Sequence, residues 1–181
     1  KRPYASSLVY DADGKRAGRY DKVHLFDVRV PESEEAYRES RSITPGTKPL
    51  IVETPWGRLG VAVCYDLRFP ELFRRMASQG MDILALPAAF TYRTGLAHWE
   101  PLLRARAIEN LCYVVAAAQT GTHPAGRQTY GRSMVIDPWG AILAQSAGRP
   151  GICSASIDPA DLKGLRQQFP VLEHRRIKTV S

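Results

Sequence analysis

The feature that most constrains the fold is a repeated pattern of short β-prone runs separated by tight-turn residues. Runs at 7–10 and 20–26 flank Asp-Ala-Asp-Gly at 11–14, and Asp-Gly supplies the positive φ angles that a hairpin turn requires. Pro-Trp-Gly at 55–57 lies between runs 50–54 and 59–64, and the same tripeptide at 138–140 lies between runs 133–137 and 141–145. These three hairpins predict substantial antiparallel pairing.

Helical patterns and continuous apolar runs alternate with the hairpins. Residues 70–78 begin with Pro and are followed by Gly80, residues 97–110 have apolar residues at helical spacing, and residues 159–168 follow Asp158 as a helix N-cap. Apolar runs at 81–86 and 111–118 predict buried strands, and residues 152–157 predict a last strand. Since no segment has linker composition, we expect one α/β domain over residues 1–181, built as a layered sandwich.

Composition narrows the classes of function. The three cysteines, 64, 112 and 153, include no Cys-x-x-Cys pair, so we expect no disulfide framework and a cytoplasmic location. The four histidines are too scattered to predict a metal site. The net charge of +7 is spread along the chain, which favours a solvated surface over nucleic-acid binding. The longest apolar run, 111–118, is much shorter than the ~20 residues of a membrane span.

A strand followed by a sharp turn and a helix places one cysteine in a position suited to chemistry. Val-Ala-Val-Cys at 61–64 carries Cys64 to the end of a buried strand, and a helix begins at Pro70. Such a turn exposes a side chain at the sheet edge, where helix N–H groups favour a thiolate. The turn therefore predicts a nucleophile at Cys64. The alternative is a buried structural cysteine, which is a common role for a free thiol.

Three longer motifs carry a family resemblance. They are Asp-Lys-Val-His-Leu-Phe-Asp at 21–27, Gly-Val-Ala-Val-Cys-Tyr-Asp-Leu-Arg-Phe-Pro-Glu at 60–71, and His-Trp-Glu at 98–100 with Arg-Ala-Arg-Ala-Ile-Glu-Asn at 104–110. In this order they resemble the nitrilase superfamily of carbon–nitrogen hydrolases. Residues 112–119, 130–134, 137–140 and 174–176 are similar to its Nit branch, so the resemblance extends over essentially the whole chain.

The resemblance implies an α-β-β-α sandwich and a Glu-Lys-Cys catalytic triad. Cys64 matches the nucleophile and Lys22 the triad lysine, which would lower the pKa of the thiol. Lys22 and the backbone N–H of Tyr65 would form the oxyanion hole. Glu39 matches a second glutamate of the family, which would orient Lys22. The alternatives are a surface lysine and a solvated carboxylate, the usual states of these residues.

The triad glutamate has no match in this sequence. In the family it precedes the lysine, and no Glu precedes Lys22 here. We therefore expect the chain to lack roughly the N-terminal third of the family fold, together with the general base. Two results are expected: apolar sheet faces left exposed, and negligible amide hydrolysis by the 181-residue chain alone.

The implied reaction is hydrolysis of a non-peptide amide C–N bond through a thioester on Cys64, with release of ammonia and without a cofactor. The Nit branch suggests small amides that carry a carboxylate, such as deaminated glutathione or α-ketoglutaramate-like compounds. Arg68 and Arg93 are candidates to bind that carboxylate, with Phe90 and Thr94 lining the pocket. An ion pair with a neighbouring carboxylate is the structural alternative for Arg68, and a loop spacer is the alternative for the lining residues.

The resemblance also implies assembly into a homodimer or higher homo-oligomer, with the helix at 97–110 as a candidate interface. Two other functions are possible. One is a different amidase, carbamoylase or nitrilase activity of the superfamily, and the other is a non-catalytic binding protein with a degenerate pocket. The presence of both Lys22 and the Cys64 turn favours the enzyme.

Overall fold

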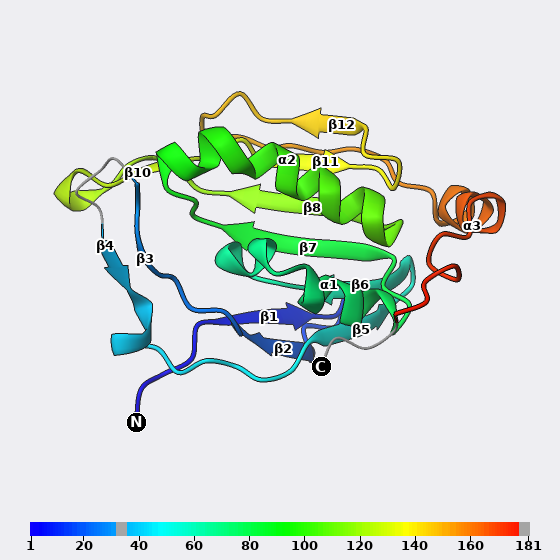
Figure 1. The fold of residues 1–181 in the computed structure, drawn as a ribbon, viewed down its shortest axis with the longest axis horizontal. Helices are drawn as coiled ribbons and strands as arrows, with labels where there is room; N and C mark the ends of the chain where they lie inside the picture. The colour runs from blue at the N-terminus through cyan, green and yellow to red at the C-terminus, as the bar shows by residue number, and fades with distance from the viewer. Residues whose placement is uncertain (32–35, 178–181) are drawn as a thin grey trace.

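The computed structural model describes residues 1–31 and 36–177, and its centre is a six-stranded sheet in the order β12-β11-β8-β7-β6-β5 (Figure 1). The inner strands β6, β7 and β8 are parallel, and the outer neighbours pair antiparallel. The strand bounds are β5 (Leu50–Thr54), β6 (Gly57–Val61), β7 (Ile83–Ala88), β8 (Tyr113–Ala118), β11 (Met134–Ile136) and β12 (Ile142–Gln145).

Helices α1 (Pro70–Ala77) and α2 (Tyr92–Asn110) cover one face of this sheet (Figure 1). Their inward side chains repeat at three- and four-residue spacing, as a helix packed on one side requires. Trp99, Leu103 and Ala107 of α2 are fully buried, and so are Phe73 and Met76 of α1. The core of the molecule therefore lies between these two helices and the sheet.

The opposite face of the sheet is covered only in part. Helix α3 (Pro159–Gln168) places Leu162 against Ile83 and Tyr113, which are buried. Further along β8, Val115 is 40% exposed, although its neighbours Val114 and Ala116 are buried. Alternate side chains of a strand point to opposite faces, so the exposed residues belong to the face away from α1 and α2. Exposed apolar surface on the sheet is thus observed, as expected.

Three small hairpins and three short 3-10 helices complete the described fold. The hairpins are β1 (Ser6–Tyr10) with β2 (Arg16–Asp21), β3 (Asp27–Arg29) with β4 (Ala36–Arg38), and β9 (Thr120–Thr122) with β10 (Gln128–Tyr130). The 3-10 helices are η1 (Glu39–Arg41), η2 (Cys64–Arg68) and η3 (Pro124–Gly126). None of the helices in the described ranges has the length and apolar character that crossing a bilayer requires.

The predicted α/β class is confirmed, and most predicted elements are present. Asp158 caps α3 by accepting a hydrogen bond from the Ala160 N–H at 2.7 Å. The predicted helix at 97–110 begins earlier, at Tyr92. The expected sandwich has two sheets between two helix layers. The described residues form one six-stranded sheet and the helix layer that covers it. The three predicted hairpins form, but the centre of the sheet is parallel.

One predicted strand is wrong. Residues 152–157 form no sheet ladder with any described residue, and Ile152 is 95% exposed. The apolar pattern of this segment is strand-like, but a strand exists only where a neighbouring strand supplies hydrogen-bond partners. Ile157 instead packs beside Leu162 and the starts of β7 and β8.

Candidate active site

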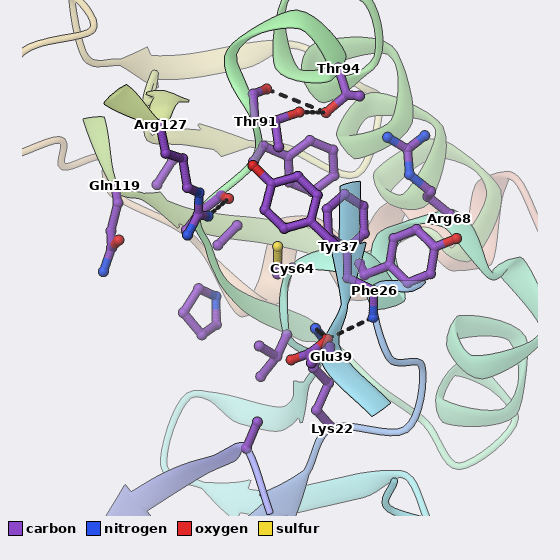
Figure 2. Close-up of a pocket in the computed structure, with 18 of the residues that line it drawn as sticks. Lys22, Phe26, Tyr37, Glu39, Cys64, Arg68, Thr91, Thr94, Gln119 and Arg127 are labelled. Carbon is purple, nitrogen blue, oxygen red and sulfur yellow. Dashed lines mark hydrogen bonds and ion pairs between the residues drawn. The ribbon is translucent and has the colours of Figure 1, made fainter. Parts of the chain in front are cut away.

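A cavity of about 880 Å³ opens at the carboxyl ends of the three parallel strands. Residues 63–65 after β6, 87–90 at the end of β7, and 117–119 at the end of β8 form its floor. Side chains from β4, η1 and the segment before β10 form its walls (Figure 2). Ligands of α/β sheets bind at this edge, because the loops that follow parallel strands converge there.

Cys64 lies in this cavity on a strained turn. The strand β6 ends at Val61 and η2 begins at Cys64, whose φ of 51° is in the left-handed region. A non-glycine residue held there costs on the order of 1–3 kcal/mol, and such strain is concentrated at functional sites. The surrounding structure must impose this conformation. The predicted sharp turn after a buried strand is therefore present, and it begins directly at the cysteine.

Lys22 and Glu39 form an ion pair in the same cavity. Lys22 follows β2 and is only 4% exposed, so it is not a surface lysine. Its Nζ donates to Oε2 of Glu39 at 2.5 Å, and the same oxygen accepts the backbone N–H of Phe26 at 2.7 Å. The pair lies below Cys64 in the view of Figure 2. The structure thus brings together the three residues that the sequence placed at positions 22, 39 and 64.

Asp66 ties the lysine and the cysteine together, and sequence reasoning did not assign it. It is fully buried. Its Oδ1 accepts the backbone N–H of His24 at 3.0 Å and contacts the ring Nδ1 of His24 at 2.8 Å. Its Oδ2 accepts the Val63 N–H at 2.9 Å and the Tyr20 hydroxyl at 2.8 Å. One carboxylate therefore fixes the segment that carries Lys22 against the turn that carries Cys64.

The environment of Cys64 disfavours the thiolate. Burial raises the pKa of the Cys64 thiol above its ordinary value, and the nearby charge of Glu39 acts in the same direction. A backbone hydrogen bond from Ala89 and the charges of Lys22 and Arg127 lower that pKa, but they do not offset the burial. The charge of Lys22 thus acts in the predicted direction, but desolvation is the larger effect, and the net pKa of the thiol is raised rather than lowered as expected.

A protonated thiol changes what the site requires. A thiol is a weak nucleophile, so a group that removes its proton is needed before attack. Tyr65 directly follows Cys64 in the first turn of η2. Backbone N–H groups in a first turn have no acceptor within the helix, so the Tyr65 N–H is available to a ligand. This position suits an oxyanion-hole donor, with Lys22 as the second donor.

Three of the four predicted substrate-binding residues line the cavity. They are Arg68, Phe90 and Thr94. The Arg68 guanidinium lies over the Phe90 ring, 5.3 Å from its centroid, and donates to Nδ1 of His98 at 3.2 Å. No carboxylate of the described ranges forms an ion pair with Arg68. Thr94 Oγ1 lies 2.8 Å from Thr91 Oγ1.

The fourth residue, Arg93, is exposed on the first turn of α2 and is not one of the residues that line the cavity. The sequence predicts Arg93 in a substrate-binding loop after a strand. In the structure α2 begins at Tyr92, so Arg93 is part of a helix and lies outside the cavity lining. Sequence reasoning missed Arg127, Gln119 and Tyr37, which do line the cavity. Their local sequence carries no catalytic signal, because only the pairing of β3 with β4 and of β9 with β10 brings them to this edge.

Within residues 1–31 and 36–177, no group of three or more His, Cys, Asp or Glu side chains is arranged to hold a metal ion. The cavity offers a thiol, a lysine and a carboxylate within one enclosure, with aromatic rings and three arginines around them. This set can support acyl transfer through a sulfur nucleophile.

Comparison with known proteins gives consistent results. Residues 1–167 match the model of a family described as carbon-nitrogen hydrolase. The deaminated glutathione amidase of Yersinia enterocolitica is 50% identical over 171 residues, which are 94% of this chain and 60% of that protein. The chain thus spans less than two thirds of the length of this relative.

Solved structures agree with this match. The Caenorhabditis elegans NitFhit protein superposes with a TM-score of 0.90 at 51% identity, over 97% of this chain and 42% of that one. A variant of an amidase from Nesterenkonia superposes with a TM-score of 0.75 at 28% identity, over 94% of this chain and 58% of that one. That structure contains the acetamide moiety of fluoroacetamide, covalently added at the active-site cysteine.

Proposed function

Because this chain belongs to the carbon-nitrogen hydrolase family, we propose that it carries the nucleophile of an amidase, with Cys64 attacking the carbonyl of a small carboxylate-bearing amide. The motifs at 21–27 and 60–71 predicted this family, and the match over residues 1–167 confirms it. The relatives named deaminated glutathione amidase support an amide as the substrate class. The placement of Cys64, Lys22 and Glu39 in one cavity is the observation that carries the proposal.

The proposed reaction has two halves. Cys64 Sγ loses its proton to a base and bonds to the amide carbon, while Lys22 and the Tyr65 N–H stabilise the negative charge on the oxygen. The C–N bond then breaks, the nitrogen takes up a proton and leaves as ammonia, and a thioester remains. Water cleaves the thioester, which gives the carboxylic acid and restores the thiol. The cysteine adduct of the Nesterenkonia amidase supports attack by sulfur.

Glu39 acts in this scheme by positioning Lys22. Its Oε2 accepts hydrogen bonds from Lys22 Nζ at 2.5 Å and from the Phe26 N–H at 2.7 Å, so this carboxylate is already occupied in holding the lysine.

We further propose that the 181-residue chain alone turns over amides very slowly. Of the residues described, Glu39 is the only carboxylate that lines the cavity, and it is committed to Lys22. General-base assistance is typically worth 10²–10⁴-fold, and Cys64 needs it because burial raises the pKa of its thiol. Amide turnover by this chain that disappears in Cys64→Ala would contradict this part of the proposal.

The nucleophile assignment is tested by alkylation, which needs no turnover. The chain is treated with iodoacetamide, and the modification of each cysteine is followed by peptide mass mapping. We expect the amide butyramide to slow the modification of Cys64 in a saturable way, because it competes for the same cavity. Cys153 is partly exposed and does not line the cavity, so it serves as the internal reference. If butyramide at high concentration leaves Cys64 labelling unchanged, the cavity is not an amide site.

A further inference from the structure

The cavity carries more positive than negative charge. Lys22, Arg38, Arg68 and Arg127 line it, against the single described carboxylate of Glu39. Glu39 neutralises Lys22 at 2.5 Å and Arg38 lies opposite Asp27, whereas Arg68 and Arg127 form no ion pair with a carboxylate of the described residues. Charges that are partly removed from water are costly unless they are paired. The cavity is therefore complementary to an anionic ligand.

Arg127 carries a buried donor group that has no hydrogen-bond partner among the described residues. Its Nη2 donates to the carbonyl oxygen of Ala89 at 3.0 Å, and its guanidinium lies 5.7 Å from the Tyr37 ring centroid. Its Nε is buried and has no hydrogen-bond partner among the described residues. A guanidinium has five N–H donors, and a buried donor left unpaired is unfavourable. The fold thus holds a cation in the cavity wall with a buried donor left unpaired.

Arg127 lies in the hairpin formed by β9 and β10, directly before β10, and this hairpin is anchored to the rest of the site. The Arg127 carbonyl accepts the His123 N–H at 2.7 Å, and the Tyr130 N–H donates to Phe90 O at 3.0 Å. An isolated bridge joins Thr129 to Thr91 at the start of α2. These contacts attach the Arg127 segment to the loop that follows β7. The backbone of Arg127 is thus held at the cavity, and the bond from Nη2 to the Ala89 carbonyl holds its guanidinium against the wall.

One residue connects Arg127 directly to the nucleophile. The Ala89 carbonyl accepts from Arg127, and the Ala89 N–H makes the backbone hydrogen bond to Cys64. Ala89 therefore bridges the guanidinium and the sulfur through one hydrogen bond at each of its backbone groups. An amide whose carboxylate binds at Arg127 can extend along this residue toward Sγ of Cys64.

Arg68 occupies a different part of the cavity. In the view of Figure 2, Arg127 and Gln119 lie on one side of Cys64 and Arg68 on the other. Arg68 is stacked over Phe90 and Tyr65 and donates to His98, so its guanidinium already has partners. Its position and contacts make it the weaker candidate for a carboxylate.

We propose that Arg127 binds the carboxylate of the amide substrate, and that it determines the preference of this site for short ω-amides of carboxylic acids over neutral amides. This inference rests on the proposed function, because it presumes that amides bind beside Cys64. Paired N–H donors of a guanidinium match the two oxygens of a carboxylate, which a lysine or an amide cannot reproduce.

The test compares two ligands of nearly equal shape. Succinamate and butyramide differ in that a carboxylate replaces a terminal methyl group. Each is titrated against the iodoacetamide labelling of Cys64, and the midpoint of protection gives its binding constant independently of the labelling rate. We expect wild-type chain to bind succinamate more tightly. In Arg127→Gln we expect the ratio of the two constants to fall roughly 10- to 100-fold, the equivalent of one charge-assisted contact.

Two further variants make the outcome decisive. Arg16→Gln removes the same charge from an exposed position on β2 and should leave the ratio at its wild-type value. A fall of the ratio in Arg68→Gln but not in Arg127→Gln would overturn the assignment. So would a preference for succinamate that is equal in wild type and Arg127→Gln. Absence of protection by both ligands in wild type would instead refute the proposed amide site, so the two failures are distinguishable.

Discussion

Replacing Asp66 by Asn should destabilise the protein and disturb the geometry of the site without changing the size of the side chain. The two carboxylate oxygens face two donors each: the backbone and ring N–H groups of His24 at Oδ1, and the Val63 N–H and the Tyr20 hydroxyl at Oδ2. An asparagine has a single acceptor oxygen. In its best orientation the amide NH₂ group replaces Oδ2, where the Tyr20 hydroxyl can rotate to accept.

The cost can be estimated from this arrangement. The Val63 N–H then faces another donor, which removes a hydrogen bond to a charged group worth about 1.5–3 kcal/mol. The two bonds from His24 persist to a neutral oxygen and weaken by roughly 1 kcal/mol each, while the lower cost of burying a neutral group offsets part of the loss. The net loss is about 2–4 kcal/mol of unfolding free energy, or ~5–15 °C in Tm for a chain of this size.

Two measurements check this prediction. Thermal unfolding followed by circular dichroism gives the shift in Tm, and iodoacetamide labelling reports the position of Cys64. Asp13→Asn, at an exposed turn residue, makes the same chemical change and should shift Tm by little. If Asp66→Asn unfolds at the temperature of Asp13→Asn and Cys64 reacts as in wild type, the carboxylate does not hold the two segments together.

Other predictions concern titration. Because burial raises the pKa of Cys64, its iodoacetamide rate should still increase above about pH 10, where a free thiol of pKa ~8.5 is almost fully ionised; a plateau already reached by about pH 10 would contradict this. Lys22→Met removes a charge that lowers the pKa of Cys64, so the same rate profile should shift to higher pH, and an unchanged profile would exclude a role for that charge. Burial, aided by the charge of Asp66, also raises the pKa of Tyr20. The stability that Tyr20 contributes is complete below its unfolded pKa of about 10 and declines at higher pH, by up to ~1.4 kcal/mol per pH unit. Between pH 10 and 11 urea unfolding of Tyr20→Phe should therefore lose less stability than wild type, and equal losses would refute the linkage.

Much of the fold was predictable because its signals are local. The turn residues at 11–14, 55–57 and 138–140 predict the hairpins that form, since the φ angles of a tight turn depend on a few adjacent residues. The N-cap at Asp158 and the proline at the start of α1 predict helices for the same reason. The strand predicted at 152–157 failed because pairing depends on a partner that no local pattern reveals.

The candidate site divides in the same way. Lys22, Glu39 and Cys64 could be predicted as site residues from the sequence, because the order and spacing of the family motifs are properties of the chain. How these residues act depends on their surroundings in the folded protein. Burial sets the pKa of Cys64 against the nearby charges, and four donors converge on Asp66 from segments far apart in sequence. Desolvation and charge pairing depend on what surrounds a group in three dimensions, so local sequence does not reveal them. The same holds for the position of Arg127 in the cavity wall, which depends on how distant segments pack.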